Sequence, residues 1–181
     1  MHSIVLSELA AIAPADATEQ AHWDDAVAWV VSGAPLFRIA KPATPPKHLI
    51  SYFAVVDENS ILLVDHKNAQ LWLPAGGHVD VDEHPRATVV RELYEELGIR
   101  VALDGVEPPL MVTCTDTVGL TAGHTDVSLW YVINADRGTP ITFDTSEFHT
   151  VRWFKFDEVP LQRSDPHLAM FLTKLVATKM A

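Results

Sequence analysis

The sequence predicts an α/β fold in which one internal helix lies among strands and further helices flank them at both ends of the chain. Apolar residues recur at helical spacing near the two ends and over residues 85–97. Between these segments, short runs rich in β-branched and aromatic residues alternate with turn-forming residues, as is typical of strands. One helix embedded among many strands favours either an α+β fold or a layered α/β/α sandwich.

Residues 1–47 are predicted to form a helical extension that ends in a Pro-rich connector. Ser3 can cap a first short helix. A second helix begins near Asp16, because Asp16 and Glu19 have the spacing of a capping box. Its expected buried face carries four apolar residues: Trp23, Val27, Val30 and Val31. The segment KPATPPK then interrupts regular structure before the first strand.

Residues 48–181 form the second predicted unit, which begins with strands. A hairpin is predicted over SYFAVVD and ILLVDH, because the turn residues 57–60 separate two apolar, β-branched runs. Further strands are predicted at residues 71–73, 110–116, 124–135 and 151–156. Pro85 begins the internal helix and Gly98 ends it. A last helix is predicted over residues 166–180, where leucine and phenylalanine recur at helical spacing.

Composition argues against several classes of function. The 181 residues include 13 Lys and Arg against 24 Asp and Glu, which gives a formal net charge of −11. Such an acidic chain is not expected to bind a nucleic-acid polymer or an anionic membrane. No stretch approaches the roughly 20 apolar residues that span a bilayer. The single cysteine, Cys114, cannot form an intrachain disulfide, which favours a reducing compartment and a cytoplasmic location.

Three glutamates on the internal helix form the first candidate site. Glu92, Glu95 and Glu96 are spaced i, i+3 and i+4, so they share one helix face. Like charges at this spacing destabilise an isolated helix, and a hard divalent cation such as Mg²⁺ offsets their repulsion. A solvated acidic surface is the alternative interpretation. The opposite face is expected to enter the core and carries Ala87, Val90, Leu93, Tyr94 and Leu97.

The glutamates belong to a longer pattern at fixed spacing. Gly77 is followed after five residues by Glu83, and after seven more by RELYEELGI at residues 91–99. This pattern resembles the Nudix box, and the resemblance to the Nudix hydrolase family, in its MutT-like branch, covers about residues 48–178. It implies a Nudix-type α/β/α sandwich with a mixed sheet, to which the N-terminal helical extension is added.

The resemblance also implies an activity and a cofactor. Nudix enzymes cleave a nucleoside diphosphate linked to another moiety through attack of water on phosphorus, with a divalent metal that is usually Mg²⁺ and for which Mn²⁺ can substitute. The implied metal ligands are Glu92, Glu95, Glu96 and the backbone carbonyl of Gly76. The general base varies within the family: some members use a box glutamate, here Glu92 or Glu96, and others a glutamate on a distant loop. Structural roles beside the metal are implied for Gly77, Glu83 and Arg91.

Glu147 is the candidate for the distant loop. MutT-like members carry a glutamate six residues before a tryptophan on a late strand, and Glu147 precedes Trp153 by six residues. Asp144 lies close enough in the sequence to take the role instead. A glutamate that merely caps a turn is the structural alternative.

Six further residues are candidates for substrate contacts: His66, Lys67, His78, His124, Asp126 and Asp165. The first three flank the box loop, and the next two begin a strand that should approach the same cleft. Asp165 stands near the position at which MutT-like enzymes often carry a purine-reading Asn or Asp. Plain surface positions are the alternative for the first three, a polar start of a strand for the next two, and a helix N-cap for Asp165.

The predicted function is metal-dependent hydrolysis of a pyrophosphate bond, with a nucleoside triphosphate, such as one that resembles 8-oxo-dGTP, as the favoured substrate and monophosphate and pyrophosphate as products. Markers of the ADP-ribose, dinucleoside-polyphosphate, NADH and coenzyme A subgroups are absent. An ADP-ribose or nucleotide-sugar pyrophosphatase and a non-catalytic nucleotide sensor remain alternatives. Isopentenyl diphosphate isomerase is disfavoured, because its box loop resembles NSVCGHP where this chain has LPAGGHV. The expected partner is a small nucleotide, and a homodimer stays open.

Overall fold

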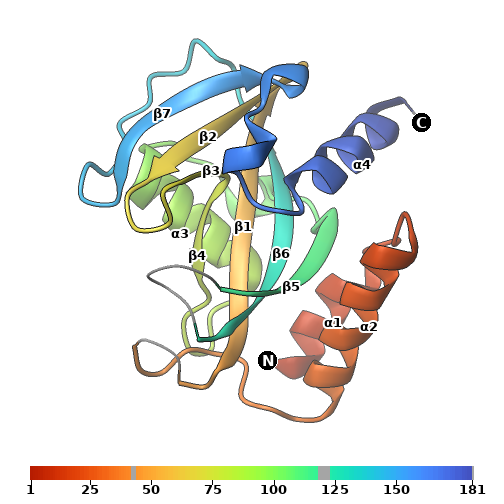
Figure 1. Ribbon diagram of the computed structural model, residues 1–181. Coiled ribbons are helices and arrows are strands. Elements are labelled where there is room, and N and C mark those ends of the chain that lie inside the picture. Colours follow the sequence, from red (N-terminus) through yellow and green to blue (C-terminus); the bar gives the residue numbers. More distant parts are fainter. Residues whose placement is uncertain (42–43, 118–122, 181) are drawn as a thin grey trace.

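The computed structural model describes residues 1–41, 44–117 and 123–180, and in these ranges the strands form one seven-stranded mixed sheet with helices around it (Figure 1). The strands are β1 (Lys47–Asp57), β2 (Ser60–His66), β3 (Leu71–Leu73), β4 (Ala75–His78), β5 (Met111–Asp116), β6 (Thr125–Asn134) and β7 (Phe148–Lys155). The α-helices are α1 (His2–Ala10), α2 (Ala17–Val31), α3 (Pro85–Leu97) and α4 (Leu168–Met180). Short 3₁₀ turns occupy Leu103–Gly105, Phe156–Glu158 and Leu161–Arg163. The predicted α/β class, with a mixed sheet between helices, is confirmed.

Strand β1 organises the sheet because it pairs with three other strands. It runs parallel to β6 along its whole length, from Lys47↔Thr125 to Val56↔Asn134. Its middle residues, Ile50 to Phe53, pair antiparallel with β4, and its last residues form the predicted hairpin with β2. Strands β4 and β2 therefore leave β1 at different points, and the sheet divides between them.

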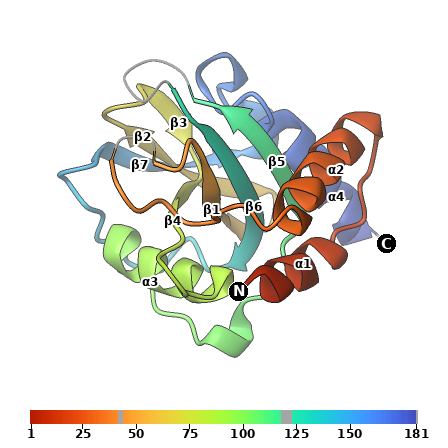
Figure 2. The same cartoon turned by 90° about the horizontal axis from the view of Figure 1, so that it is seen from below.

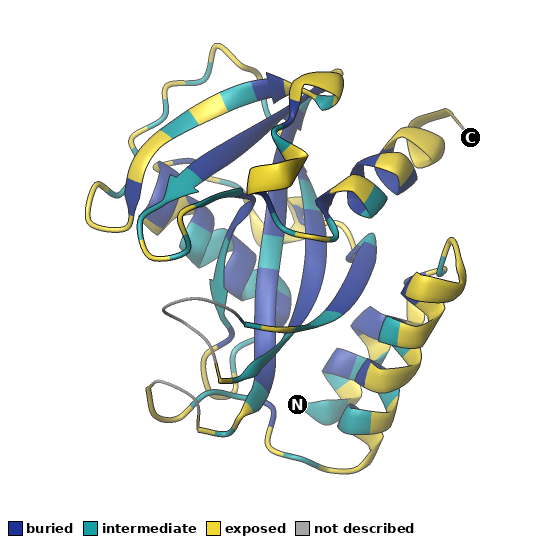
Figure 3. Cartoon of the chain, in the orientation of Figure 1, coloured by how far each residue is buried: buried dark blue, intermediate teal, exposed yellow. Residues whose placement is uncertain are grey.

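Helices cover both faces of the sheet. On one face, α3 places Leu93 and Leu97 in the same apolar cluster as Phe53 of β1. On the other face, α4 places Phe171 against Trp130 of β6, with ring centroids 5.1 Å apart. Figure 3 shows β1 and β6 buried along most of their length between these layers. This arrangement is the α/β/α sandwich that the element order favoured.

The N-terminal extension packs on the edge of the sheet that β5 forms. Helix α2 lies beside β5, and α1 lies between α2 and the α3 layer (Figure 2). Val5, Leu9 and Val30 are buried in the cluster that also contains the α3 core residues. The connector continues this contact, because the backbone N–H of Leu49 donates to the carbonyl of Leu36 at 2.8 Å. The extension therefore shares its core with the rest of the chain.

Three burial predictions for the helices were wrong. Val31, at the last position of α2, is 67% exposed, because the packed face of the helix carries its neighbour Val30 and not Val31. Tyr94 was expected in the core but is 47% exposed, and the Arg100 guanidinium covers its ring at 3.9 Å from the centroid. Glu96 was expected on an exposed acidic face but is only 6% exposed. The buried face of α3 is thus rotated toward Glu96.

Two boundaries and one strand also differ from the sequence-based prediction. Residues 75–78 were expected in a loop, yet they form β4. Backbone pairing with β1 makes them a strand, although glycine at positions 76 and 77 gives no side-chain pattern. Strand β7 begins at Phe148 rather than 151, and α4 begins at Leu168 rather than 166.

No helix in the described ranges is long and apolar enough to cross a membrane.

Glu8 links the extension to the sandwich through a buried network. Its carboxylate is 3% exposed and accepts hydrogen bonds from Arg86 Nη2 at 2.8 Å and from the Tyr131 hydroxyl at 3.0 Å. We expect Glu8→Ala to lower the free energy of unfolding by about 2–3 kcal/mol, because it leaves the buried hydroxyl and the cation without their partner. Urea unfolding measures this change.

The control for this substitution is Glu158→Ala. Glu158 is a surface residue whose side chain is 60% exposed and lies 3.5 Å from Lys155. Its loss should change the unfolding free energy by no more than about 0.5 kcal/mol. Equal losses in the two variants would contradict the structural role of Glu8.

Candidate active site

A cavity of about 290 Å³ opens beside the point at which β4 and β2 leave β1. Apolar residues of several strands form part of its wall, among them Tyr52, Val64 and Leu73. Eight of the residues predicted for the site also line it: His66, Gly76, Gly77, His78, Glu96, His124, Asp126 and Asp165. The fold therefore gathers residues from the box loop, from α3 and from the start of β6 around one cavity.

The two glycines of β4 allow close contacts on different sides of this strand. A Cβ at Gly76 would lie 2.4 Å from the carbonyl oxygen of Ser51 in β1, and one at Gly77 would lie 2.1 Å from Oε1 of Glu92 in α3. Gly76 also has a φ of +153°, which L side chains rarely adopt. Its N–H donates to Oε2 of Glu96 at 3.0 Å. Glu92 can thus approach the β4 backbone only because position 77 carries no side chain.

Glu96 is a buried carboxylate, and among the described residues no Lys, Arg or His side chain forms an ion pair with it. Burial, followed by the charges of Glu92 and Glu147, raises the pKa of Glu96 to about 9 against the opposing hydrogen bond from Gly76. Burial also raises the pKa of Glu92, although Arg91 opposes that shift. Carboxylate oxygens held together against repulsion beside a close-packed backbone are a donor set that fits Mg²⁺.

Arg91 connects the box helix to the loop that precedes it. Its guanidinium donates to both Glu83 oxygens, at 3.0 and 2.9 Å, and to the His78 carbonyl at 3.2 Å. It also donates to Glu92 at 2.6 Å and to Glu95 at 3.3 Å. Glu83 in turn accepts from the Thr88 hydroxyl at 2.7 Å. This network fixes the direction of Glu92, which faces Gly77.

The three helix glutamates therefore have different surroundings. Glu96 lines the cavity, and Glu92 is held between Arg91 and Gly77. Glu95 has a side chain that is 57% exposed and is not among the residues that line the cavity. The shared helix face predicted from their spacing is thus divided between a buried part and a solvent-exposed part.

Glu147 is exposed in the turn that leads into β7, and its charge acts on two carboxylates of the box helix. It contributes to raising the pKa of Glu92 and of Glu96, and it partly opposes the lowering of the His66 pKa by burial. The Lys67 N–H donates to the Glu147 carbonyl at 2.9 Å, and the Lys67 ammonium donates to the Thr145 carbonyl. Lys67 therefore holds this turn to the end of β2, and the structure does not place it among the cavity residues.

Asp144 has a different environment from Glu147. Its N–H donates to the Glu96 carbonyl at 2.9 Å, and its Oδ1 accepts from the Ser146 N–H at 2.7 Å. These hydrogen bonds from Ser146 hold the pKa of Asp144 below its usual value. Asp144 thus closes the turn that carries Glu147.

Asp165 lies in the segment that leads into α4. Its Oδ1 accepts from the His167 N–H at 2.8 Å just before α4 begins, as a capping residue does. It also lines the cavity, where burial raises its pKa to about 6. The cavity wall therefore includes a carboxyl group from this segment.

Sequence reasoning missed several cavity residues that belong to no motif. Arg38 comes from the connector of the extension, and Tyr52 from the middle of β1. Burial lowers the pKa of Arg38 and raises that of Tyr52. His48 does not line the cavity, but it is fully buried beside His78 and Asp126, which do. His48 and Tyr52 share a face of β1 because they are four residues apart in a strand, but what that face meets follows only from the register of β1 against its neighbours.

Gly77→Ala should disable the box without disrupting the sheet. The added Cβ would meet Oε1 and Cδ of Glu92, at 2.1 and 2.4 Å, so the carboxylate must turn away from β4. We expect turnover to fall by about 10²-fold or more, because an ion-binding or catalytic group is displaced by an ångström or more. Steady-state kinetics measures the loss, with the substrate that the panel described below selects. Far-UV circular dichroism checks the fold.

Gly105→Ala is the matched control, because no atom lies within 4 Å of the Cβ that this change would add. It should leave turnover unchanged. Normal activity in Gly77→Ala would show that the position of Glu92 against β4 has no catalytic importance.

Known proteins resemble this chain in sequence and in fold. The family model described as NUDIX domain matches residues 47–175. A MutT-like protein of Streptomyces ambofaciens is 27% identical over 134 residues, which are 73% of this chain and 80% of that protein. A crystal structure of a MutT NUDIX hydrolase from Burkholderia pseudomallei aligns with a TM-score of 0.57 at 27% identity, over 71% of this chain and 97% of that one.

A more distant structure shares the fold alone. A C. elegans Ap4A hydrolase aligns with a TM-score of 0.59 at 15% identity, over 73% of this chain and 97% of that one. The matched family region begins at the first residue of β1 and ends within α4, so it includes the whole sheet and the box. The chain belongs to the Nudix hydrolase family.

Proposed function

We propose that this protein is a metal-dependent pyrophosphohydrolase that converts a nucleoside triphosphate to the monophosphate and pyrophosphate. The observation that carries the proposal is the buried Glu96 on the cavity wall, with Glu92 beside it and the Gly76 backbone against it. Relatives that only bind nucleotides are expected to lack such box carboxylates, and this chain retains all of them.

The proposed ligands of Mg²⁺ are Glu92, Glu95, Glu96 and the Gly76 carbonyl. When bound there, the ion would neutralise phosphate charge and lower the pKa of a coordinated water. Arg91 directs Glu92 toward Gly77, and the Gly76 N–H directs one Glu96 oxygen, so both groups are oriented before substrate arrives. Glu147 is the proposed general base, which accepts the proton of the attacking water.

The cavity supports a nucleoside as the organic part of the substrate. Its wall combines the aromatic ring of Tyr52 and aliphatic side chains such as Leu71 with many polar and charged side chains, a mixture that suits a small heteroaromatic ligand carrying phosphates. Asp165 can accept a hydrogen bond from a purine N–H, and it can also donate one when protonated. We therefore propose a purine nucleotide, with an oxidised purine such as 8-oxo-dGTP among the first compounds to test.

A substrate panel with product identification tests the function. The panel contains nucleoside triphosphates, 8-oxo-dGTP, ADP-ribose, nucleotide sugars and dinucleoside polyphosphates, each with Mg²⁺ or Mn²⁺, and Glu96→Gln as the negative control. Monophosphate and pyrophosphate from a triphosphate are expected. Cleavage of ADP-ribose or a nucleotide sugar alone would show the alternative pyrophosphatase, and nucleotide binding without any product would show a sensor.

A cytoplasmic location and a possible homodimer complete the proposal. Cys114 is the single cysteine, and burial raises its pKa to about 12. A partly buried thiol with a raised pKa stays protonated and is poorly reactive, as suits a reducing compartment. Size-exclusion chromatography with light scattering tests the homodimer.

A further inference from the structure

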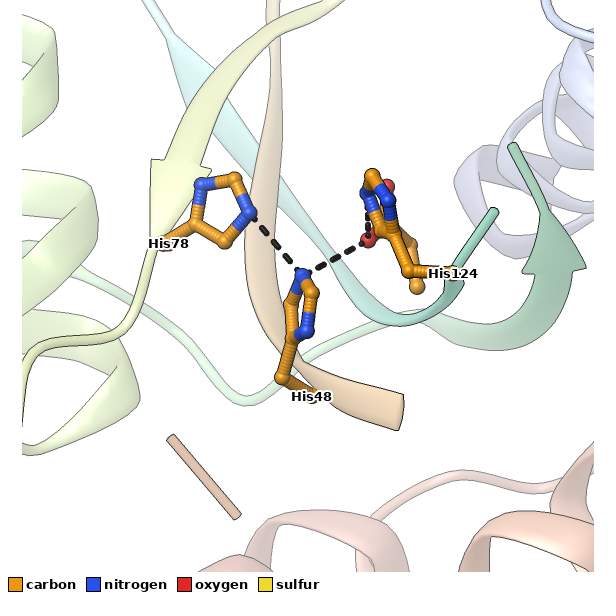
Figure 4. A group of neighbouring side chains, drawn as sticks. His48, His78 and His124 are labelled. Atoms are coloured by element: carbon orange, nitrogen blue, oxygen red, sulfur yellow. Dashed lines mark hydrogen bonds and ion pairs between the residues drawn. The ribbon is translucent and has the colours of Figure 1, made fainter. Parts of the chain in front are cut away.

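Three histidines and one aspartate converge at the end of the sheet next to the box loop. His48, His78 and His124 point their rings toward one another (Figure 4). Nε2 of His48 lies 3.1 Å from Nε2 of His78, and Oδ1 of Asp126 lies 3.3 Å from Nε2 of both His48 and His124. All four potential ligand atoms lie within 4.8 Å of one another.

The register of the sheet brings these residues together. His48 pairs with Asp126 in the parallel ladder of β1 and β6. His78 ends β4 and pairs with Ile50, two residues beyond His48. His124 comes immediately before β6. The cluster therefore rests on the ends of three paired strands, which hold its geometry more firmly than a loop would.

The outer ring nitrogens of two histidines have protein oxygen partners. Nδ1 of His48 lies 2.9 Å from the Pro45 carbonyl, which can only accept, so this nitrogen carries the proton. Nδ1 of His124 lies 3.2 Å from the Thr117 hydroxyl, which donates its own proton to the His124 carbonyl at 3.0 Å. Both contacts leave the Nε2 lone pair directed into the cluster. Histidines that bind a metal are oriented in the same way, by a hydrogen bond from the ring nitrogen that does not touch the metal.

This orientation gives the centre of the cluster more acceptors than donors. Asp126 Oδ1 is buried and receives no hydrogen bond from the described residues. It faces the Nε2 atoms of His48 and His124, whose protons are on the other side of each ring. A buried carboxylate oxygen beside two lone pairs is unfavourable unless a cation lies among them.

We propose that His48, His78, His124 and Asp126 bind a first-row transition-metal ion of the Zn²⁺ type, at a second site that is separate from the carboxylates of α3. Zn²⁺ binds imidazole nitrogen and carboxylate oxygen at roughly 2.0–2.1 Å, so the edges of a tetrahedral site measure about 3.3 Å. The three short separations in the cluster, 3.1, 3.3 and 3.3 Å, have this length. Three imidazoles select such an ion over Mg²⁺, which prefers oxygen ligands.

The ion would connect the box loop to the rest of the sheet. His78 directly follows Gly77, whose close contact with Glu92 shapes the proposed active site. A metal bridge from His78 to β1 and β6 would fix the end of that loop. Arg38 carries a positive charge that works against a cation in the cluster, since its guanidinium acts electrostatically on Asp126 and on His124. The competing explanation is that a proton shared between the histidines and Asp126 supplies the positive charge in place of a metal ion.

Metal binding by the full-length chain separates the two possibilities. The purified protein is stripped with a chelator and titrated with Zn²⁺ against a chromophoric competitor, in millimolar Mg²⁺ that keeps the α3 carboxylates occupied. One equivalent of Zn²⁺ per chain is expected, and Co²⁺ in its place should give the intense visible absorption of a tetrahedral centre. Uptake no greater than that of nonspecific surface histidines, with no such absorption, would assign the cluster to a shared proton and overturn the proposal.

Matched variants test the ligands. His48→Gln and Asp126→Asn should each weaken Zn²⁺ binding by at least about 100-fold, because each removes a ligand. His149→Gln changes an exposed histidine of β7 and should bind Zn²⁺ as the parent does. Undiminished binding in both ligand variants would also overturn the proposal. Asp126→Asn keeps the side-chain shape and serves if the fully buried His48 does not tolerate replacement. Because no turnover is measured, the result is independent of the proposed hydrolase activity.

Discussion

Replacing Glu96 by glutamine should lower the turnover number by about 10³-fold or more. Glu96 is the box carboxylate that lines the cavity, and the Gly76 N–H holds one of its oxygens. Glutamine preserves its shape and can still accept that hydrogen bond, but it removes the charge that would bind the metal. Single-turnover kinetics with Mg²⁺ measures the effect. A folded Glu96→Gln protein with near-normal activity would contradict the assignment of Glu96.

The same substitution should stabilise the metal-free protein at alkaline pH. In the unfolded chain Glu96 loses its proton near its ordinary pKa of 4.5, whereas in the folded chain its pKa is about 9. Between these values the folded state binds more protons, so the contribution of Glu96 makes stability fall as the pH rises. Glu96→Gln removes that contribution, and the variant should lose less stability than the parent between pH 5 and pH 9.

Added Mg²⁺ should make the parent more stable than Glu96→Gln at alkaline pH. A ligand that binds only the folded state at a hundred times its dissociation constant contributes about 2.7 kcal/mol. The parent should gain stability from Mg²⁺ at pH 8, and Glu96→Gln should gain much less. Thermal melting at several pH values, with Glu158→Gln as an exposed control, measures both effects. Identical pH dependence in parent and Glu96→Gln would refute the buried, uncompensated state of Glu96.

The elements that the sequence predicts well are those with a local cause. The capping contact of Asp16 with the Glu19 N–H, 2.9 Å, forms at the start of α2 as the spacing of the two residues indicates. Pro85 and the left-handed Gly98 bound α3 at the expected residues. The box itself is a contiguous pattern, so its glycines and glutamates are found without any knowledge of the fold.

Features that depend on pairing between distant strands could not be predicted. Residues 75–78 become a strand only because β1 supplies their hydrogen-bond partners. Glu96 is buried where α3 packs against β4, so close that the Gly76 N–H donates to its carboxylate at 3.0 Å, which helical spacing alone does not show. His48 was read as the start of a strand, since its neighbours in space, His78 and Asp126, are 30 and 78 residues away in the chain.

Glu147→Gln should reduce turnover by roughly 10²–10⁴-fold, the usual range for a positioned general base. Glu147 lies in an exposed turn, and its charge acts on both Glu92 and Glu96. The substitution removes the proton acceptor and leaves every packed contact in place, so the melting temperature should barely change. The acidic limb of the kcat/KM pH profile, which reports the free base, should flatten in the variant.

Asp144→Asn is the control, because it changes the neighbouring carboxylate with little effect on the turn. The asparagine oxygen can still accept from the Ser146 N–H, as Asp144 does at 2.7 Å. Hydrogen bonds already engage Asp144 in closing the turn, so it is poorly placed to accept a proton from water, and Asp144→Asn should keep turnover within a few-fold of the parent. If Asp144→Asn loses activity and Glu147→Gln keeps it, the general base is Asp144, three residues before Glu147. If neither variant loses activity, the base must lie on α3, where Glu92, held at 2.6 Å by Arg91, is the remaining carboxylate that is oriented but not fully buried.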